Sequence, residues 1–216
     1  MKLHLGCGEK YLEGYLNVDF PSEAHTVQSQ NPADLQIDLL QLNYPLASID
    51  EIRLHHVFEH FTRPVACALL AAWQSWLKIG GVLHLEVPDF TRTAAVILNP
   101  LASAGAKAVA MRHLFGSHEA AWAVHCEGYT QRMLKSLLEV YGFKVVEMRH
   151  NSWQGTHNLE IRAQNITDIN TLDSLRARTR DYLSAYLLDN IQEEPLLETW
   201  MNMFDQQLQR CIGTDG

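Results

Sequence analysis

The sequence predicts an α/β fold, in which a mostly parallel sheet carries helices on its faces and an antiparallel hairpin at one edge. Through the first two-thirds of the 216-residue chain, short apolar segments of strand length alternate with segments whose apolar residues recur at helical spacing. The last two strand segments are separated by turn-forming residues and by no helix. We therefore expect these two strands to pair antiparallel.

Four strand-like segments precede the first helix. We expect strands at residues 2–5, 15–19, 35–39 and 51–55, with a polar loop between the second and the third. Residues 82–87 read as a fifth strand, because Val, Leu and His alternate there until Pro88 stops the pattern. The edge hairpin is expected at residues 143–149 and 158–163, with the turn at residues 151–156.

Helical spacing begins at Pro64, a residue favoured at the first position of a helix. We expect this helix to run to Leu77 and to end at Gly80 and Gly81, with Trp73 and Trp76 in the core. Residues 93–114 are also helical in pattern, and Asn99-Pro100 must break or kink them. A histidine-rich loop at residues 116–128 leads to a further helix at residues 130–141.

From Asp168 onward the pattern is entirely helical, and we interpret residues 166–216 as a helical extension to a domain of residues 1–165. One apolar stripe runs from Ile169 to Ile191, and a second starts at Pro195 and includes Trp200, Met201 and Phe204. An apolar face of this size predicts a lid or a contact in a homodimer. The alternative is that both helices pack back on the same sheet.

Composition excludes several classes of protein. Apolar residues make up 47% of the chain and charged residues 19%, as in a soluble protein with a substantial core. A net charge of −8, with no basic patch, argues against nucleic acid as a partner. There is no apolar run of about 18 residues, so we expect no membrane span. Four widely spaced cysteines and no secretion signal predict free thiols and a cytoplasmic protein.

Three signals of a ligand site follow adjacent strands. Gly6-Cys7-Gly8 makes a turn without side chains at two of its positions, Asp19 closes the second strand, and Asp38-Leu39 closes the third. Ligands of open α/β sheets bind at the carboxyl ends of the strands, where such residues meet. The chain has Tyr11 where a dinucleotide-binding fingerprint needs its third glycine, which argues against NAD or FAD.

Taken in order, four motifs resemble those of the class I S-adenosylmethionine-dependent methyltransferases: LHLGCG, GYLNVD, HHVFEHF and LKIGGVLHLEVPDF. The closest similarity is to a subgroup of predicted small-molecule methyltransferases with the pattern LNLGCG…NVD…HVLEHF…VPD. The resemblance covers about residues 1 to 165. It implies a Rossmann-like seven-stranded sheet with strand order 3-2-1-4-5-7-6. It also implies S-adenosylmethionine as cofactor and a small-molecule or glycan-like acceptor.

The resemblance also implies roles for residues of the site. Gly6, Cys7 and Gly8 would approach the methionine part of the cofactor. Asp19 would hold the ribose, and Asp38 and Leu39 would hold the adenine. His56 would lie near the methyl-bearing sulfonium.

An alcohol acceptor needs a base to remove its proton, and a group that titrates near neutral pH suits this task. The candidates are His60 after the fourth strand, Asp89 after the fifth, and His125 in the covering loop. We expect His125 to be the base, because it matches a recurring histidine before Gly128-Tyr129, with Asp89 orienting it or binding the acceptor hydroxyl. Alternatively, His60 and His125 only form hydrogen bonds with the loop backbone.

The sequence also contains two patterns that could bind a metal ion and two departures from the family pattern. Residues 56–60 match an inverted zinc-protease motif, but the helix that this chemistry needs starts only at Pro64. The spacing of His113, His118, His125 and Cys126 fits no common zinc pattern, so we predict no metal.

His4 replaces the acid that the family has in its first strand, and Lys10 replaces a loop glycine. These departures motivate the alternative of a catalytically degenerate binding or scaffold protein with the same fold.

Overall fold

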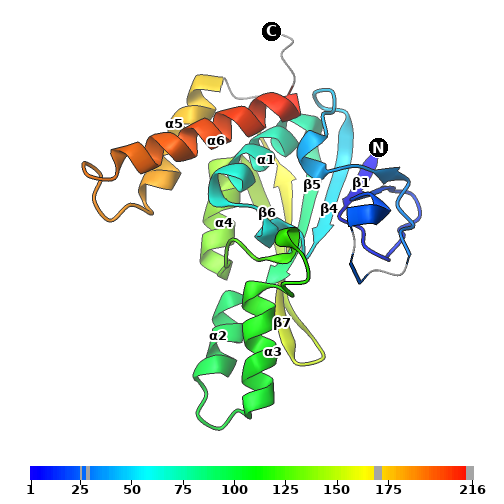
Figure 1. Ribbon diagram of the computed structural model, residues 1–216. Helices are drawn as coiled ribbons and strands as arrows, with labels where there is room; N and C mark the ends of the chain where they lie inside the picture. The colour runs from blue at the N-terminus through cyan, green and yellow to red at the C-terminus, as the bar shows by residue number, and fades with distance from the viewer. Residues whose placement is uncertain (25, 28–29, 168–171, 213–216) are drawn as a thin grey trace.

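The computed structural model describes residues 1–24, 26–27, 30–167 and 172–212. Seven strands form one sheet in the order β3-β2-β1-β4-β5-β7-β6, which confirms the predicted fold class and strand order (Figure 1). The strands are β1 (Lys2–Leu5), β2 (Leu16–Asp19), β3 (Leu35–Gln36), β4 (Ile49–His55), β5 (Leu77–Pro88), β6 (Phe143–Trp153) and β7 (Thr156–Asn165). The α-helices are α1 (Arg63–Trp76), α2 (Phe90–Leu98), α3 (Ala104–Phe115), α4 (Gln131–Val140), α5 (Leu172–Ser184) and α6 (Glu194–Ile212).

The first five strands are parallel to one another, and β7 runs antiparallel to both β5 and β6. The carboxyl ends of β1, β2, β4 and β5 therefore meet at one edge of the sheet. From β1, the chain adds β2 and β3 on one side of the sheet and then returns to add β4 and β5 on the other side. The order of the strands therefore changes direction between β1 and β4. A crevice forms at such a switch point, because the connections of the two neighbouring strands leave in opposite directions.

The two faces of the sheet differ sharply in chemistry. Alternate residues of the central strands, such as Leu5, Leu54 and Leu85, are fully buried in one apolar core together with α1, α4 and the C-terminal helices. The opposite face carries a row of polar side chains that are paired in register across four strands: His4, Arg53, His84 and Arg162. This alternation with a period of two is what a sheet with one apolar face requires.

The boundary between α1 and β5 differs from the prediction. The helix ends at Trp76, and Leu77 already has extended backbone and pairs with Ile49 of β4. Gly80 and Gly81, which were expected to end the helix, lie within β5 beside a register shift. Leu77 is buried, so its pairing and packing override the helical pattern that includes it.

Three further elements differ in extent. The third strand spans only Leu35–Gln36, because Asp38 caps a 3-10 helix, η2 (Leu39–Gln41), instead of extending the strand. The edge hairpin is longer than predicted and turns at Gln154 and Gly155, both with positive φ. Asn99-Pro100 separates α2 from α3 completely. These two helices form a hairpin that projects beside the tip of β6–β7 (Figure 1).

The C-terminal helices pack on α1, which was the alternative to a lid or dimer contact. Met201, Phe204 and Leu208 of α6 are buried in the main core. The indole nitrogen of Trp76 donates to the carbonyl of Cys211 at 3.2 Å, and Gln207 donates to the carbonyl of Leu40 at 2.8 Å. The apolar face that suggested a dimer is thus covered by the chain itself, and dimerisation stays a prediction. Ile169 of the first stripe lies outside the described residues.

None of the helices in the described part of the chain is both long enough and apolar enough to cross a membrane.

Candidate functional site

A cavity of about 690 Å³ lies at the carboxyl ends of β1, β2 and β4, at the switch point of the sheet. This volume is in the range of small-molecule and cofactor sites. The cavity includes all seven residues that we predicted to bind a cofactor: Gly6, Cys7, Gly8, Asp19, Asp38, Leu39 and His56. His60 also lines it. Asp89 and His125 are not among the described residues of its wall.

The turn after β1 needs glycine at two positions. Gly6 and Gly8 have φ angles of 65° and 56°, in the left-handed region that favours glycine. A Cβ atom at Gly6 would lie 2.3 Å from Cγ2 of Val57, whereas at Gly8 nothing lies within 4 Å. Gly6 therefore permits close packing against the β4 exit, and Gly8 leaves open space at the cavity wall.

Asp19 anchors this turn from the end of β2. Its side chain is buried, with one oxygen accepting from the amide of Gly8 at 2.5 Å and the other from the amide of Phe20 at 2.7 Å. Each carboxylate oxygen has two lone pairs and can accept more than one hydrogen bond. The carboxylate can hold the turn and a ligand at the same time.

The wall beyond Asp19 is mostly apolar. Leu39 is buried there, and Asp38 accepts a hydrogen bond from the amide of Leu40 at 2.9 Å as the N-cap of η2. The rings of Phe20 and Trp122 lie 6.0 Å apart at an angle of 43°. These groups form a surface on which a flat, apolar ring system can lie, with a carboxylate at its rim.

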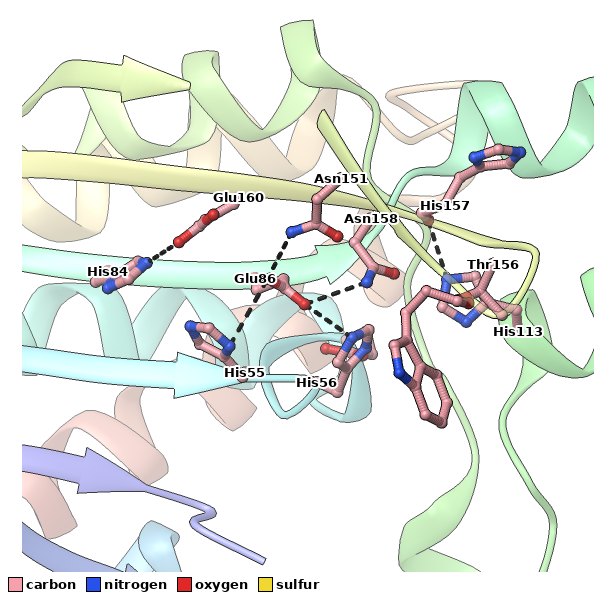
Figure 2. A network of polar contacts seen from close by, with 12 residues as sticks. His55, His56, His84, Glu86, His113, Asn151, Thr156, His157, Asn158 and Glu160 are labelled. Atoms are coloured by element: carbon pink, nitrogen blue, oxygen red, sulfur yellow. Dashed lines mark hydrogen bonds and ion pairs between the residues drawn. The ribbon is translucent and has the colours of Figure 1, made fainter. Parts of the chain in front are cut away.

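His56 lies between two carboxylates at the exit of β4, and Figure 2 shows its contact with one of them, Glu86. Its Nδ1 lies 3.3 Å from Glu59 and its Nε2 3.3 Å from Glu86, and its backbone has a φ of 55°. Burial opposes the charge of the imidazolium, but the two carboxylates outweigh it and raise the pKa of His56 to about 10. Burial also opposes the charge of Glu86, whose hydrogen bonds with His56 and Asn151 lower its pKa to about 2.

His60 and His125 come together although 64 residues separate the segments that carry them. The rings lie 4.7 Å apart, nearly perpendicular. Nδ1 of His60 donates to the carbonyl of Val124 at 3.1 Å, which leaves its Nε2 as a potential acceptor. Nε2 of His125 lies 3.9 Å from Glu59, and burial lowers the pKa of His125.

Asp89 occupies a structural position. Its carboxylate caps α2 by accepting from the amide of Arg92 at 3.1 Å, and it pairs with His150 at 2.8 Å. Its side chain is 2% exposed. Asp89 thus orients the start of α2, and its side chain does not reach the cavity.

Among the described residues, His113, His118, His125 and Cys126 do not come together as ligands of one metal ion. His113 donates a hydrogen bond to the carbonyl of His157 at 3.0 Å, and His118 donates one to the carbonyl of Phe115 at 2.9 Å. Cys126 is exposed. His56 precedes the 3-10 helix η3 (Phe58–His60), so the H-x-x-E-H motif is not on one helix. Two other groups within the described ranges have the spacing of metal ligands: His55–His84–Glu160 and Glu59–His60–His125.

Sequence reasoning missed four residues of this region. Phe20 follows Asp19 directly, so its place in the cavity wall could have been inferred from that position. Glu59 belongs to the motif HHVFEHF, but nothing in that motif indicates that its side chain is fully buried. The positions of Trp122 and Glu86 depend on the folding of a loop and on the register of β5. No local pattern encodes either.

Comparison with known proteins supports the fold. No protein-family model matches the chain, and no curated protein matches it either. Several solved structures are similar to the chain in fold. A SAM-dependent methyltransferase from Methanosarcina mazei is similar over 77% of this chain and 92% of its own, at 16% identity and a TM-score of 0.52. One from Mesorhizobium loti is similar over 76% and 89%, at 14% identity and a TM-score of 0.52.

A third structure contains the Haloferax volcanii Trm112 methyltransferase activator and the putative methyltransferase. One chain of it is similar over 78% of this chain and 83% of its own, at 11% identity and a TM-score of 0.54. These likenesses define the class of architecture. The chain has the Rossmann-like methyltransferase fold with added C-terminal helices.

Proposed function

We propose that this protein is an S-adenosylmethionine-dependent methyltransferase that acts on a small-molecule or glycan-like acceptor. One observation carries the proposal: a single cavity at the switch point of the sheet joins the glycine turn, Asp19 and the apolar wall around Leu39. The solved structures with this fold that are described as SAM-dependent methyltransferases support the same assignment.

The residues of the cavity fit this cofactor part by part. The buried carboxylate of Asp19, which lines the cavity at the end of β2, suits the two ribose hydroxyls, and the wall of Leu39, Phe20 and Trp122 suits an adenine ring. Asp38 stands at the rim, where it can accept from the adenine amino group. The open space at Gly8 leaves room for the methionine part next to the backbone.

When bound, S-adenosylmethionine supplies a methyl group on a positively charged sulfur. Without a bound metal ion, the group of His56, Glu59 and Glu86 suits this charge, because two carboxylates outweigh one imidazolium and leave a net negative charge at the β4 exit. His55 does not offset that charge, since burial and the neighbouring Arg53 lower its pKa to about 3 and keep it neutral at physiological pH. The electrostatic match favours the cofactor over its neutral product.

We assign the acceptor side of the site to His60 and His125. His60 lines the cavity, and its contact with Val124 leaves Nε2 able to take a proton from an acceptor hydroxyl. His125 contacts His60 from behind, and Asp89 acts as a positioning residue that orients α2. Catalysis then comes mainly from holding the acceptor oxygen or nitrogen in line with the methyl group.

Replacing His60 or His125 by alanine should lower turnover at least about tenfold, because the group that accepts or relays the proton is lost. The affinity for S-adenosylhomocysteine should not change. The assay is transfer of a labelled methyl group from S-adenosylmethionine to a panel of hydroxyl- and amine-bearing small molecules and oligosaccharides. His157→Ala, on the edge hairpin, is the matched control and should keep full activity.

Full activity in both His60→Ala and His125→Ala would contradict the assignment, and so would a parallel loss of cofactor affinity. The alternative is a binding protein without catalysis. It follows from His4 and Lys10, which depart from the family pattern and both line the cavity. Binding of S-adenosylhomocysteine with no labelled product from any acceptor would favour that alternative.

A further inference from the structure

Glu59, His60 and His125 offer three ligand atoms that all lie within 4.8 Å of one another, and His60 lines the cavity. Glu59 and His60 belong to η3, while His125 comes from the covering loop, whose Cys126 and Glu127 amides bond to the carbonyl of Glu59 at 2.8 and 3.2 Å. We propose that these three side chains bind a divalent ion of the first transition series. This site differs from both metal patterns that the sequence suggested, and from our expectation of no metal.

Glu59 is the strongest indication of a cation. Its side chain is 1% exposed, and its Oε2 accepts no hydrogen bond from any described residue. A buried carboxylate oxygen with no partner among the described residues is costly, and a bound metal ion removes that cost.

The imidazole of His60 is oriented as metal ligands usually are. A ligating histidine typically donates its other N–H to a backbone carbonyl, which fixes the ring and its tautomer. His60 donates from Nδ1 to the carbonyl of Val124, so Nε2 keeps its lone pair. In His125 the buried Nδ1 has no partner among the described residues, and Nε2 lies 3.9 Å from Oε1 of Glu59.

Two imidazoles and one carboxylate suit zinc, iron(II) or cobalt better than magnesium or calcium, which prefer oxygen ligands only. Metal–ligand bonds of about 2.0–2.2 Å place ligand atoms roughly 3 to 3.5 Å apart, so the three groups must close by about 1 Å. Three protein ligands would also leave a coordination position open for a further ligand, and His60 lines the cavity.

The second group with ligand spacing, His55–His84–Glu160, has a different environment. Nη1 of Arg53 lies 3.2 Å and Nη1 of Arg162 3.3 Å from Nδ1 of His84 (Figure 2 shows His84 with Glu160). Two guanidinium groups at this distance repel a cation and occupy the nitrogen that would bind it. This group therefore serves as the internal control.

With an ion bound to Glu59, His60 and His125, the ion would activate the acceptor in place of Nε2 of His60. Coordination of a hydroxyl oxygen lowers its pKa and fixes its position, which a methyl acceptor needs. This role rests on the proposed methyltransferase function, whereas the metal site itself does not. Binding of the metal can be measured without cofactor or acceptor, so the two proposals can fail separately.

The test is binding of Zn²⁺ to the full chain, measured by equilibrium dialysis and metal analysis, with Co²⁺ as a spectroscopic probe. We expect one ion per chain and, for Co²⁺, visible absorption bands of a low-coordinate site. Second-sphere changes typically cost about 10- to 100-fold in affinity, so loss of a ligand in Glu59→Gln, His60→Ala or His125→Ala should cost at least about 100-fold. His84→Ala should bind as the wild type does.

Absence of stoichiometric Zn²⁺ binding by the wild type would overturn the proposal. Equal loss in His84→Ala, or unchanged affinity in His60→Ala and His125→Ala, would also overturn it. Because Glu59 is buried, Glu59→Gln is checked for folding by circular dichroism, and the two histidine variants decide the matter if it unfolds. A visible Co²⁺ band that disappears in His60→Ala but persists in His84→Ala would support the site.

Discussion

Replacing Asp19 by alanine should weaken the binding of S-adenosylhomocysteine at least about 100-fold, since each hydrogen bond to a charged group contributes about 1.5–3 kcal/mol. Two such bonds, one from each ribose hydroxyl, are lost. In addition, the amides of Gly8 and Phe20 lose the carboxylate that holds the turn in place. Isothermal titration of wild type and variant measures the difference.

Two further variants make this result specific. Asp19→Asn keeps the shape of the side chain but loses the charge and one acceptor oxygen, so its affinity should lie between those of wild type and Asp19→Ala. Asp205→Ala removes a carboxylate that pairs with Arg176 between the C-terminal helices and should leave the affinity unchanged. Undiminished binding in Asp19→Ala would contradict the assignment of the ribose to Asp19.

The variant Phe204→Ala should lower the free energy of unfolding by about 3–5 kcal/mol, the usual cost of removing a buried phenylalanine ring. Phe204 is fully buried in the core that α6 shares with α1. For a chain of this size the expected decrease in melting temperature is roughly 10 °C. Chemical denaturation followed by circular dichroism measures the free energy of unfolding, and a thermal scan followed in the same way measures the melting temperature.

Leu188→Ala is the control for that measurement, because Leu188 is 96% exposed and should change the unfolding free energy by less than about 0.5 kcal/mol. A stability of Phe204→Ala equal to that of wild type would mean that α6 does not pack on α1 in solution. The lid or dimer contact predicted from Trp200, Met201 and Phe204 would then become the better account of these helices.

The strand order and the edge hairpin were predictable, since local pattern and an ordered set of motifs both determine them. The shared location of Gly6, Asp19 and Asp38 in one cavity was predictable for the same reason, because they lie at or just after the carboxyl ends of neighbouring strands. Their role in binding a cofactor stays a prediction. Residues whose place depends on a neighbouring strand in the sheet, such as Glu86, could not be predicted in this way.

The acceptor side was harder to predict for a physical reason. His125 reaches Glu59 and His60 only because the covering loop folds over η3, and loop conformation leaves no periodic signal in sequence. The end of α1 was misplaced because Leu77 fits a helical pattern equally well, and only its pairing with Ile49 decides the strand. The apolar stripe of α6 was recognised, but a stripe alone does not reveal what covers it.

The most direct test of the central claim is a crystal structure of this protein with S-adenosylhomocysteine. The adenosine should lie in the cavity at the carboxyl ends of β1 and β2, with both ribose hydroxyls within hydrogen-bond distance of Asp19 and the adenine against Leu39. Its sulfur should face His56 from the side of Gly6 and Gly8. Ligand bound elsewhere on the chain, or no bound ligand at saturating concentration, would contradict the proposed function.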